Sequence, residues 1–272
     1  MSSVVRSEPI PPGTTPLFLF TQDERLKVHP AYKQAKGGTE KAALDLVLDI
    51  AVAWLYEHRE RFAPDLLFVA PHAQEATGDN AIPQTLAAVC AAIYRGRVDT
   101  EIVQSDRVYH TGADPMERMA ARAQFEGLVV PGAGYVLVDD VTNLGGTLAE
   151  LAHFIHAFGG VVKDVVVLVN AGRNPALVPA KKFIRLIKER FHEEFTEVFG
   201  IVPEALTANE AQYLAGFKSI DALRNRFAAA EQEIDRRLRS KGIARATQRA
   251  PLGALAELSN LSAELGPQRS AE

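Results

Sequence analysis

The sequence predicts an α/β fold built around a parallel sheet. Short, uninterrupted apolar runs alternate along the chain with segments whose apolar residues recur at helical spacing. Continuous apolar runs are typical of strands buried on both faces, and the alternation of strand and helix favours right-handed parallel crossovers. The chain has 272 residues, 47% of them apolar, which is enough to bury a sizeable core.

The composition narrows the possible partners. A formal net charge of −4 and a pI near 6.0 argue against a protein that coats nucleic acid with its whole surface. The single cysteine, Cys90, lies in an apolar run, so we expect a buried thiol and exclude an intramolecular disulfide or a zinc cluster of thiolates. No stretch reaches about 18 uninterrupted apolar residues and no secretory signal opens the chain. We therefore expect a cytoplasmic protein without a membrane partner.

The first third of the chain contains a lead-in, a strand and a long helix. Four prolines among the first 16 residues predict an extended, poorly ordered lead-in with little chemistry. The apolar run 17–20 predicts a short strand. A helix with Thr39 as its N-cap is predicted to run to about Tyr56, because its apolar residues recur at helical spacing.

The middle of the chain repeats a pattern of strand, loop and helix. The predicted strands are 66–70, an edge strand 100–103, a strand beginning at 135, and 161–169. A helix over 82–94 follows the loop 71–80, and a second helix follows the glycines near 145 and runs to about 158. A long polar stretch covers 104–117.

Beyond residue 171 the sequence predicts helices rich in both charges. One amphipathic helix is expected over 181–199, because its phenylalanines and isoleucines fall on one stripe. A short helix closed by Gly216 covers 206–217, and another begins after Ser219. The last 25 or so residues lack a strong period and are predicted to be a mobile tail.

One segment carries most of the functional signal. A buried strand ends in Asp139 and Asp140 and turns through the loop 142–147 into a helix. The carboxyl edge of a parallel sheet is where such folds bind ligands. Glycine allows a ligand to approach the backbone closely, and the N–H groups, the Thr147 hydroxyl and the positive end of the helix suit a phosphate. The two acids suit vicinal sugar hydroxyls, so the segment predicts a sugar-phosphate site.

Four other interpretations of this segment compete with a sugar-phosphate site. The acids and glycines could form no more than a tight turn. A response-regulator receiver domain needs a later strand that ends in aspartate, but 165–169 leads into Asn170. A P-loop needs a lysine directly after its glycines, where this chain has Thr147. A dinucleotide fingerprint needs its glycines after the first strand, whereas Gly132 and Gly134 precede a strand.

The run 136–147, Val-Leu-Val-Asp-Asp-Val-Thr-Asn-Leu-Gly-Gly-Thr, resembles the signature of type I phosphoribosyltransferases, which bind 5-phosphoribosyl 1-diphosphate (PRPP). The resemblance covers roughly residues 64–170. The family has a hydroxyl residue where this chain has Asn143, and threonine or glycine where it has Leu144, so both positions depart from the pattern.

The resemblance implies a type I phosphoribosyltransferase fold with a C-terminal helical extension, and it divides the chain into four parts. Residues 1–60 form an N-terminal segment and the hood over the acceptor base, and 61–175 form the phosphoribosyltransferase core. Residues 176–245 form the helical extension, and 246–272 form the mobile tail.

The resemblance also implies a set of site residues. Catalytic roles fall on Asp139, Asp140, Arg107 and Arg118. Substrate binding falls on Thr142, Asn143, Leu144, Gly145, Gly146, Thr147, on Pro71, His72 and Ala73 of the pyrophosphate loop, and on His110 of a closing loop. Magnesium bound near Asp139 and Asp140 would bridge pyrophosphate and ribose oxygens, since Mg²⁺ prefers few carboxylates plus substrate oxygens.

The implied function is PRPP-dependent transfer of ribose 5-phosphate between pyrophosphate and a nitrogenous base or related acceptor, by a homodimer. The alternative is a catalytically weak sensor of PRPP or a nucleotide with a DNA- or protein-binding extension. Residues 206–227 resemble a helix-turn-helix in outline, with Arg224 and Arg226 on the second helix. Residues 204–249 hold nine basic and six acidic residues, a modest excess that also fits a packing or dimerisation appendage.

Overall fold

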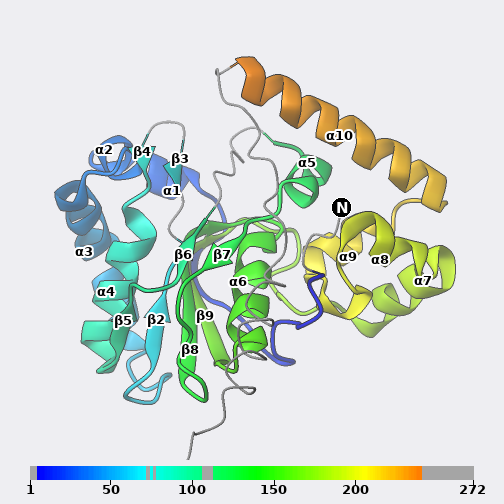
Figure 1. Cartoon of the computed structure of the whole chain (residues 1–272). Coiled ribbons are helices and arrows are strands. Elements are labelled where there is room, and N and C mark those ends of the chain that lie inside the picture. The colour runs from blue at the N-terminus through cyan, green and yellow to red at the C-terminus, as the bar shows by residue number, and fades with distance from the viewer. Residues whose placement is uncertain (1–4, 72–73, 76–77, 106–112, 241–272) are drawn as a thin grey trace, which may run out of the picture.

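The computed structural model describes residues 5–71, 74–75, 78–105 and 113–240 (Figure 1). Four residues predicted for the site, His72, Ala73, Arg107 and His110, lie outside these ranges. In the described part of the chain, no helix combines the length and the apolar character needed to cross a membrane.

A parallel sheet of five strands forms the centre of the molecule, as predicted. In sheet order the strands are β1 (Leu17–Phe20), β9 (Val161–Asn170), β8 (Gly134–Thr142), β2 (Leu67–Val69) and β5 (Arg97–Asp99). From β2 the chain passes outward to β5, and it then returns to the other side of β2 to form β8. The strand order therefore reverses between β2 and β8, and their carboxyl ends frame the crevice where sheets of this kind bind ligands.

Helices cover both faces of the sheet (Figure 1). On one face α3 (Glu40–Glu57) and α4 (Ile82–Tyr94) bury Val136 and Val138 of β8 in a shared apolar cluster. On the other face α6 (Gly146–Ala157) packs on Leu137 and Val69. The continuous valine and leucine runs are thus buried on both sides, which is why the sequence predicted these strands correctly.

Smaller elements flank the carboxyl edge. They are α1 (Glu24–Lys27), α2 (Tyr32–Lys36), the ribbon of β3 (Gln74–Glu75) and β4 (Gly78–Asp79), the ribbon of β6 (Val103–Gln104) and β7 (Phe125–Glu126), and α5 (Pro115–Ala120).

The C-terminal helices form a third apolar cluster. They are α7 (Lys181–Phe191), α8 (Glu194–Phe199), the 3-10 turn η1 (Pro203–Ala205), α9 (Ala208–Leu214) and α10 (Ile220–Ser240). Met116 and Met119 of α5 and the partly buried Leu144 pack into the same cluster. The long α10 lies beside α5 (Figure 1), so these helices are packed against the rest of the chain.

The predicted edge strand at 100–103 is wrong. The edge strand is β5, which ends at Asp99. The Asp99 carboxylate accepts the N–H groups of Glu101 and Ile102, both at 3.0 Å, and this turn ends the strand. Gly96 precedes the strand where a Cβ atom would lie 2.5 Å from the carbonyl oxygen of Leu66, so the chain approaches β2 closely there.

The single helix predicted over 181–199 is also wrong, because the chain breaks it into α7 and α8. His192 adopts a positive φ of 49° between them. The break brings three phenylalanines into one stack, with ring centroids 6.4 Å apart for Phe191 and Phe195 and 4.9 Å apart for Phe195 and Phe199. Tertiary packing therefore overrides the continuous helical pattern.

The lead-in carries more structure than its prolines predicted. Arg6 is 1% exposed, and its backbone pairs in parallel with Ile201, through N–H bonds from Arg6 to Gly200 and from Val202 to Arg6. Its side chain forms ion pairs with Glu150 of α6 and Glu210 of α9. The expectation of an extended segment without chemistry fails at this residue.

Candidate functional site

Two acids at the end of β8 lie in different environments. Asp140 is 4% exposed, and its Oδ2 atom lies 2.9 Å from Nζ of Lys36 and accepts an N–H bond from the Asn80 side chain at 3.1 Å. Its other oxygen accepts the N–H of Val141 at 2.9 Å. Both oxygens of Asp140 are therefore already engaged within the chain.

Asp139 is less compensated, although the nearby charge of Lys36 also acts on it. It accepts the N–H of Asp140 at 2.8 Å, and none of the lysines and arginines in the described ranges forms an ion pair with it. Burial, followed by the negative charge of Asp140, raises the pKa of Asp139 well above its ordinary value. Asp139 is thus the member of the pair that favours an incoming proton, hydroxyl donor or cation.

Helix α2 delivers Lys36 to the acid pair. The N–H of Ala81 donates to the carbonyl of Ala35 at 3.1 Å, which joins the end of α2 to the start of α4. Asn80 then links both sides, because its Oδ1 accepts the N–H of Ile82 while its amide donates to Asp140. No local pattern of the sequence indicated that Asn80 or Lys36 would contact Asp140.

The predicted phosphate loop, 142–147, leads from β8 into α6 as expected. Gly145 has a positive φ of 83° and precedes the first residue of α6. Within the described part of the chain, the backbone N–H groups of 143–147 donate to no acceptor. Asn143 is exposed and Thr147 is partly exposed. A run of free amides at a helix N-terminus, with solvent access, suits an anion.

The C-terminal helices contact this loop through a hydrogen bond to one of its carbonyl groups and through apolar packing. The Thr207 hydroxyl donates to the carbonyl of Leu144, and Leu144 packs its side chain into the third apolar cluster. A Cβ atom on Gly145 would lie 3.2 Å from Leu177 and 3.3 Å from Thr207. The departure from the family pattern at Leu144 thus has a packing role, because this side chain joins the loop to the extension.

A buried charge network lies behind the loop. Arg6 pairs with Glu150 at 3.0 Å and with Glu210, and Arg122 pairs with Glu150 at 2.6 Å. Two arginines balance two glutamates, so the network is neutral overall. An oxygen of Glu210 lies 3.0 Å from the position of a Cβ atom on Gly146, against the first turn of α6. The network therefore ties the loop helix to the extension and to the lead-in.

Of the other predicted site residues, Pro71 lies at the same edge of the sheet as the acid pair, whereas Arg118 is not bonded to it. Pro71 is buried directly after β2, and because Val69 pairs with Leu137 in parallel, Pro71 is level with Asp139 at the same edge. Arg118 of α5 donates from Nε to the carbonyl of Ala113 at 3.0 Å, and burial lowers the pKa of its guanidinium. No bond among the described residues joins Arg118 to the acid pair.

No protein-family model matches the chain. A protein named TraN from Escherichia coli is 36% identical over 251 residues, which cover 88% of this chain and 55% of TraN. An uncharacterised protein from Haemophilus influenzae is 35% identical over 131 residues, which cover 47% of this chain and 29% of that protein. The chain thus spans about half or less of these curated relatives.

Solved structures with a partial likeness are phosphoribosyltransferases. The adenine phosphoribosyltransferase of Thermoanaerobacter pseudethanolicus has a TM-score of 0.32 and 20% identity, over 46% of this chain and 73% of that chain. A purine phosphoribosyltransferase of Pyrococcus horikoshii has a TM-score of 0.28 and 20% identity, over 46% and 80%. These scores are too low to bear on activity, and the α/β assignment rests on the strands and crossovers of the chain itself.

Proposed function

We propose that the chain binds PRPP at the carboxyl edge between β2 and β8 and transfers its phosphoribosyl group to a nitrogenous base. The observation that carries this proposal is the run of free N–H groups over 143–147, directly after an acid pair at the point where the strand order reverses. An anion cradle beside a carboxylate matches a sugar phosphate better than it matches a dinucleotide or a metal cluster.

In this proposal each part of the edge contacts a different part of PRPP. The N–H groups of 143–147 and the Thr147 hydroxyl bind the 5-phosphate. The ribose hydroxyls donate to Asp139, whose carboxylate has no cationic partner in the described ranges. The pyrophosphate lies toward Pro71, His72 and Ala73. Arg107, Arg118 and His110 are proposed to donate to its oxygens, because guanidinium groups bind phosphate oxygens with paired bonds.

The acid pair fits Mg²⁺ in part. No cluster of three or more possible metal-binding side chains occurs within the described ranges, and Mg²⁺ needs only one or two carboxylates plus substrate oxygens. Asp139 fits this requirement, whereas Asp140 does not, because Lys36 and Asn80 already occupy its Oδ2 atom. Mg²⁺ held by Asp139 and the substrate would neutralise charge on the pyrophosphate.

The transfer breaks the bond between ribose C1 and a pyrophosphate oxygen and forms a bond from C1 to a base nitrogen, which loses its proton. Positive charge develops on the ribose ring between the two events. In this proposal the Asp139 carboxylate stabilises this charge, and the pairing of Asp140 with Lys36 holds the strand end in place. Catalysis is then mainly positioning and electrostatic stabilisation.

One observation favours a second candidate, a PRPP sensor without turnover. Lys36 neutralises Asp140, which leaves one carboxylate rather than two to stabilise a developing cation. The loop is also bonded to the extension through Thr207 and Leu144, so occupancy of the loop has a direct route to the C-terminal helices. Binding without transfer is the property that separates this candidate from the first.

A pyrophosphate-release assay tests the transfer. The full chain is supplied with PRPP, Mg²⁺ and a panel of purine and pyrimidine bases, beside Asp139→Asn and beside Asp45→Asn, a control that removes an exposed acid of α3. Transfer predicts release that depends on one base and is lost only in Asp139→Asn. Binding of PRPP without release supports the sensor. The homodimer stays a prediction.

A further inference from the structure

We propose that the exposed face of α7 binds the backbone of single-stranded nucleic acid. This face carries Lys181, Lys182, Arg185 and Lys188, and Glu189 is its one exposed acid. The opposite side of α7 buries Ile187 and Phe191 in the third apolar cluster. The helix therefore presents a row of cations to solvent, which suits a polyanion.

The cations of α7 are less compensated than those of the predicted helix-turn-helix. In the described part of the chain, Lys181 and Lys182 form no ion pair, and Arg185 meets Glu189 only at 3.8 Å. On α10, by contrast, Arg224 pairs with Glu194 at 2.5 Å, Arg226 pairs with Asp114, and Arg237 pairs with Glu117 at 3.0 Å. Lys188 of α7 is paired with Glu204, so the available charge of this helix lies on Lys181, Lys182 and Arg185.

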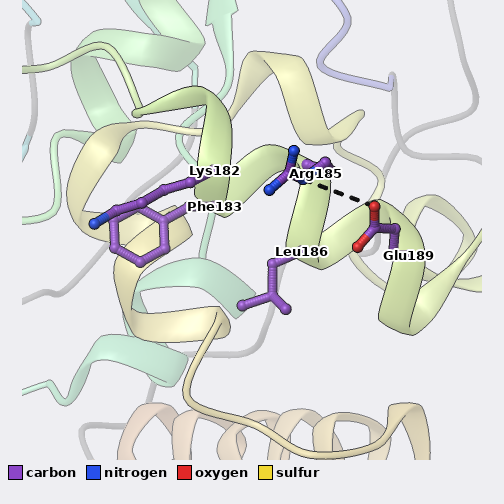
Figure 2. Close-up of a pocket in the computed structure, with 5 residues that line it drawn as sticks. All are labelled: Lys182, Phe183, Arg185, Leu186 and Glu189. Carbon is purple, nitrogen blue, oxygen red and sulfur yellow. Dashed lines mark ion pairs between the residues drawn. The ribbon is translucent and has the colours of Figure 1, made fainter.

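A hollow of about 260 Å³ opens within the same face (Figure 2). Phe183 and Leu186 line it with apolar atoms, and Lys182, Arg185 and Glu189 complete the lining. The Nζ atom of Lys182 lies 5.0 Å from the centre of the Phe183 ring. Single strands are bound where cations that track phosphates alternate with apolar or aromatic surfaces that accept bases. The hollow offers such a surface, which is why we infer a single strand and not a duplex.

A membrane surface fits this helix less well. A helix that lies in a bilayer interface buries its apolar face among lipids and keeps its cations at the headgroups. The apolar face of α7 is instead packed against α8, α9 and η1. A bilayer would therefore meet the charged side of α7, where Phe183 and Leu186 offer only a small apolar surface.

Fluorescence anisotropy with a labelled single-stranded oligonucleotide of 20 nucleotides tests this surface. We expect the full chain to bind, and Lys181→Gln, Lys182→Gln, Arg185→Gln together to weaken binding by at least tenfold. A control with Lys33→Gln, Arg59→Gln and Lys163→Gln removes the same charge from exposed positions elsewhere and should bind like the wild type. Asp139→Asn should also bind like the wild type, so this result is independent of the proposed transferase.

The salt dependence gives a second readout. Three phosphate contacts on a single strand predict a slope of about −2 in log affinity against log salt, or a loss of about 20-fold between 50 and 200 mM. The triple variant of α7 should lose most of this slope. Absence of binding, equal weakening by the control triple, or binding only to vesicles of phosphatidylserine and phosphatidylcholine would overturn the proposal.

Discussion

The Nζ atom of Lys36 lies 2.9 Å from Oδ2 of Asp140, so the second acid of the pair already has a cation from its own chain. Lys36 comes from the N-terminal part of the chain and Asp140 from the central strand. Asp139, one residue away, has no such partner in the described ranges, and burial raises its pKa. The two neighbouring acids therefore differ in their surroundings, and under the proposed function Asp139 is the one that binds the ligand.

Loss of the lysine should cost stability. In Lys36→Met the nearly buried Asp140 loses its cation, so we expect the free energy of unfolding to fall by about 1–3 kcal/mol in urea denaturation. Lys41→Met is the matched control, because Lys41 pairs with Asp45 on the exposed side of α3 and should cost less than about 1 kcal/mol. Equal losses in the two variants would show that the Lys36 pair has no special role.

Asp139 predicts an unusual pH dependence. Because its pKa is raised in the folded chain, the folded chain keeps this proton at pH values where the unfolded chain has released it. Its contribution to stability is therefore lost as the pH rises above about 4, the ordinary value for an aspartate. Thermal melting without ligand should show Asp139→Asn matching the wild type near pH 4 and exceeding it near pH 8. A constant difference across this range would contradict the assignment.

Thr207 should matter to both the extension and the loop. Its hydroxyl accepts the N–H of Glu210 at 3.1 Å as the cap of α9 and donates to Leu144 in the loop. We expect Thr207→Val to lower the free energy of unfolding by about 1–2 kcal/mol and to weaken PRPP binding. Ser219→Ala removes a comparable cap bond, to Ala222 of α10, away from the loop. PRPP binding measured by calorimetry should stay unchanged in that control.

Alanine substitutions at two glycines distinguish the cost of backbone strain from the cost of a side-chain clash. Gly145 and Gly13 have nearly equal positive φ angles, 83° and 85°. A Cβ atom would meet Leu177 and Thr207 at Gly145 but nothing within 4 Å at Gly13. Both alanine variants should lose about 1–2 kcal/mol from the left-handed conformation, and Gly145→Ala should lose more. If the two variants lost the same free energy of unfolding in chemical denaturation, the result would mean that Leu177 and Thr207 do not restrict the space at Gly145.

The local pattern of the sequence predicted β1, β2, β8, β9 and α4 well, because buried parallel strands and a helix with a single apolar stripe are encoded over a few neighbouring residues. The local pattern failed where contacts between residues far apart in the sequence determine the structure. Arg6 and Glu210 are 204 positions apart, and no local pattern near either residue predicts their ion pair. The break at His192 and the role of Leu144 likewise depend on an apolar cluster assembled from several elements.

Calorimetric titration of PRPP with Mg²⁺ into the purified chain tests the central claim most directly. Asp139→Asn is the informative variant, because it removes the acid proposed to bind the ligand and leaves the pair of Lys36 and Asp140 intact. We predict saturable binding by the wild type and by Asp45→Asn, and at least tenfold weaker binding by Asp139→Asn. The claim is contradicted if the wild type, shown by circular dichroism to be folded, binds no PRPP, or if Asp139→Asn binds it equally well.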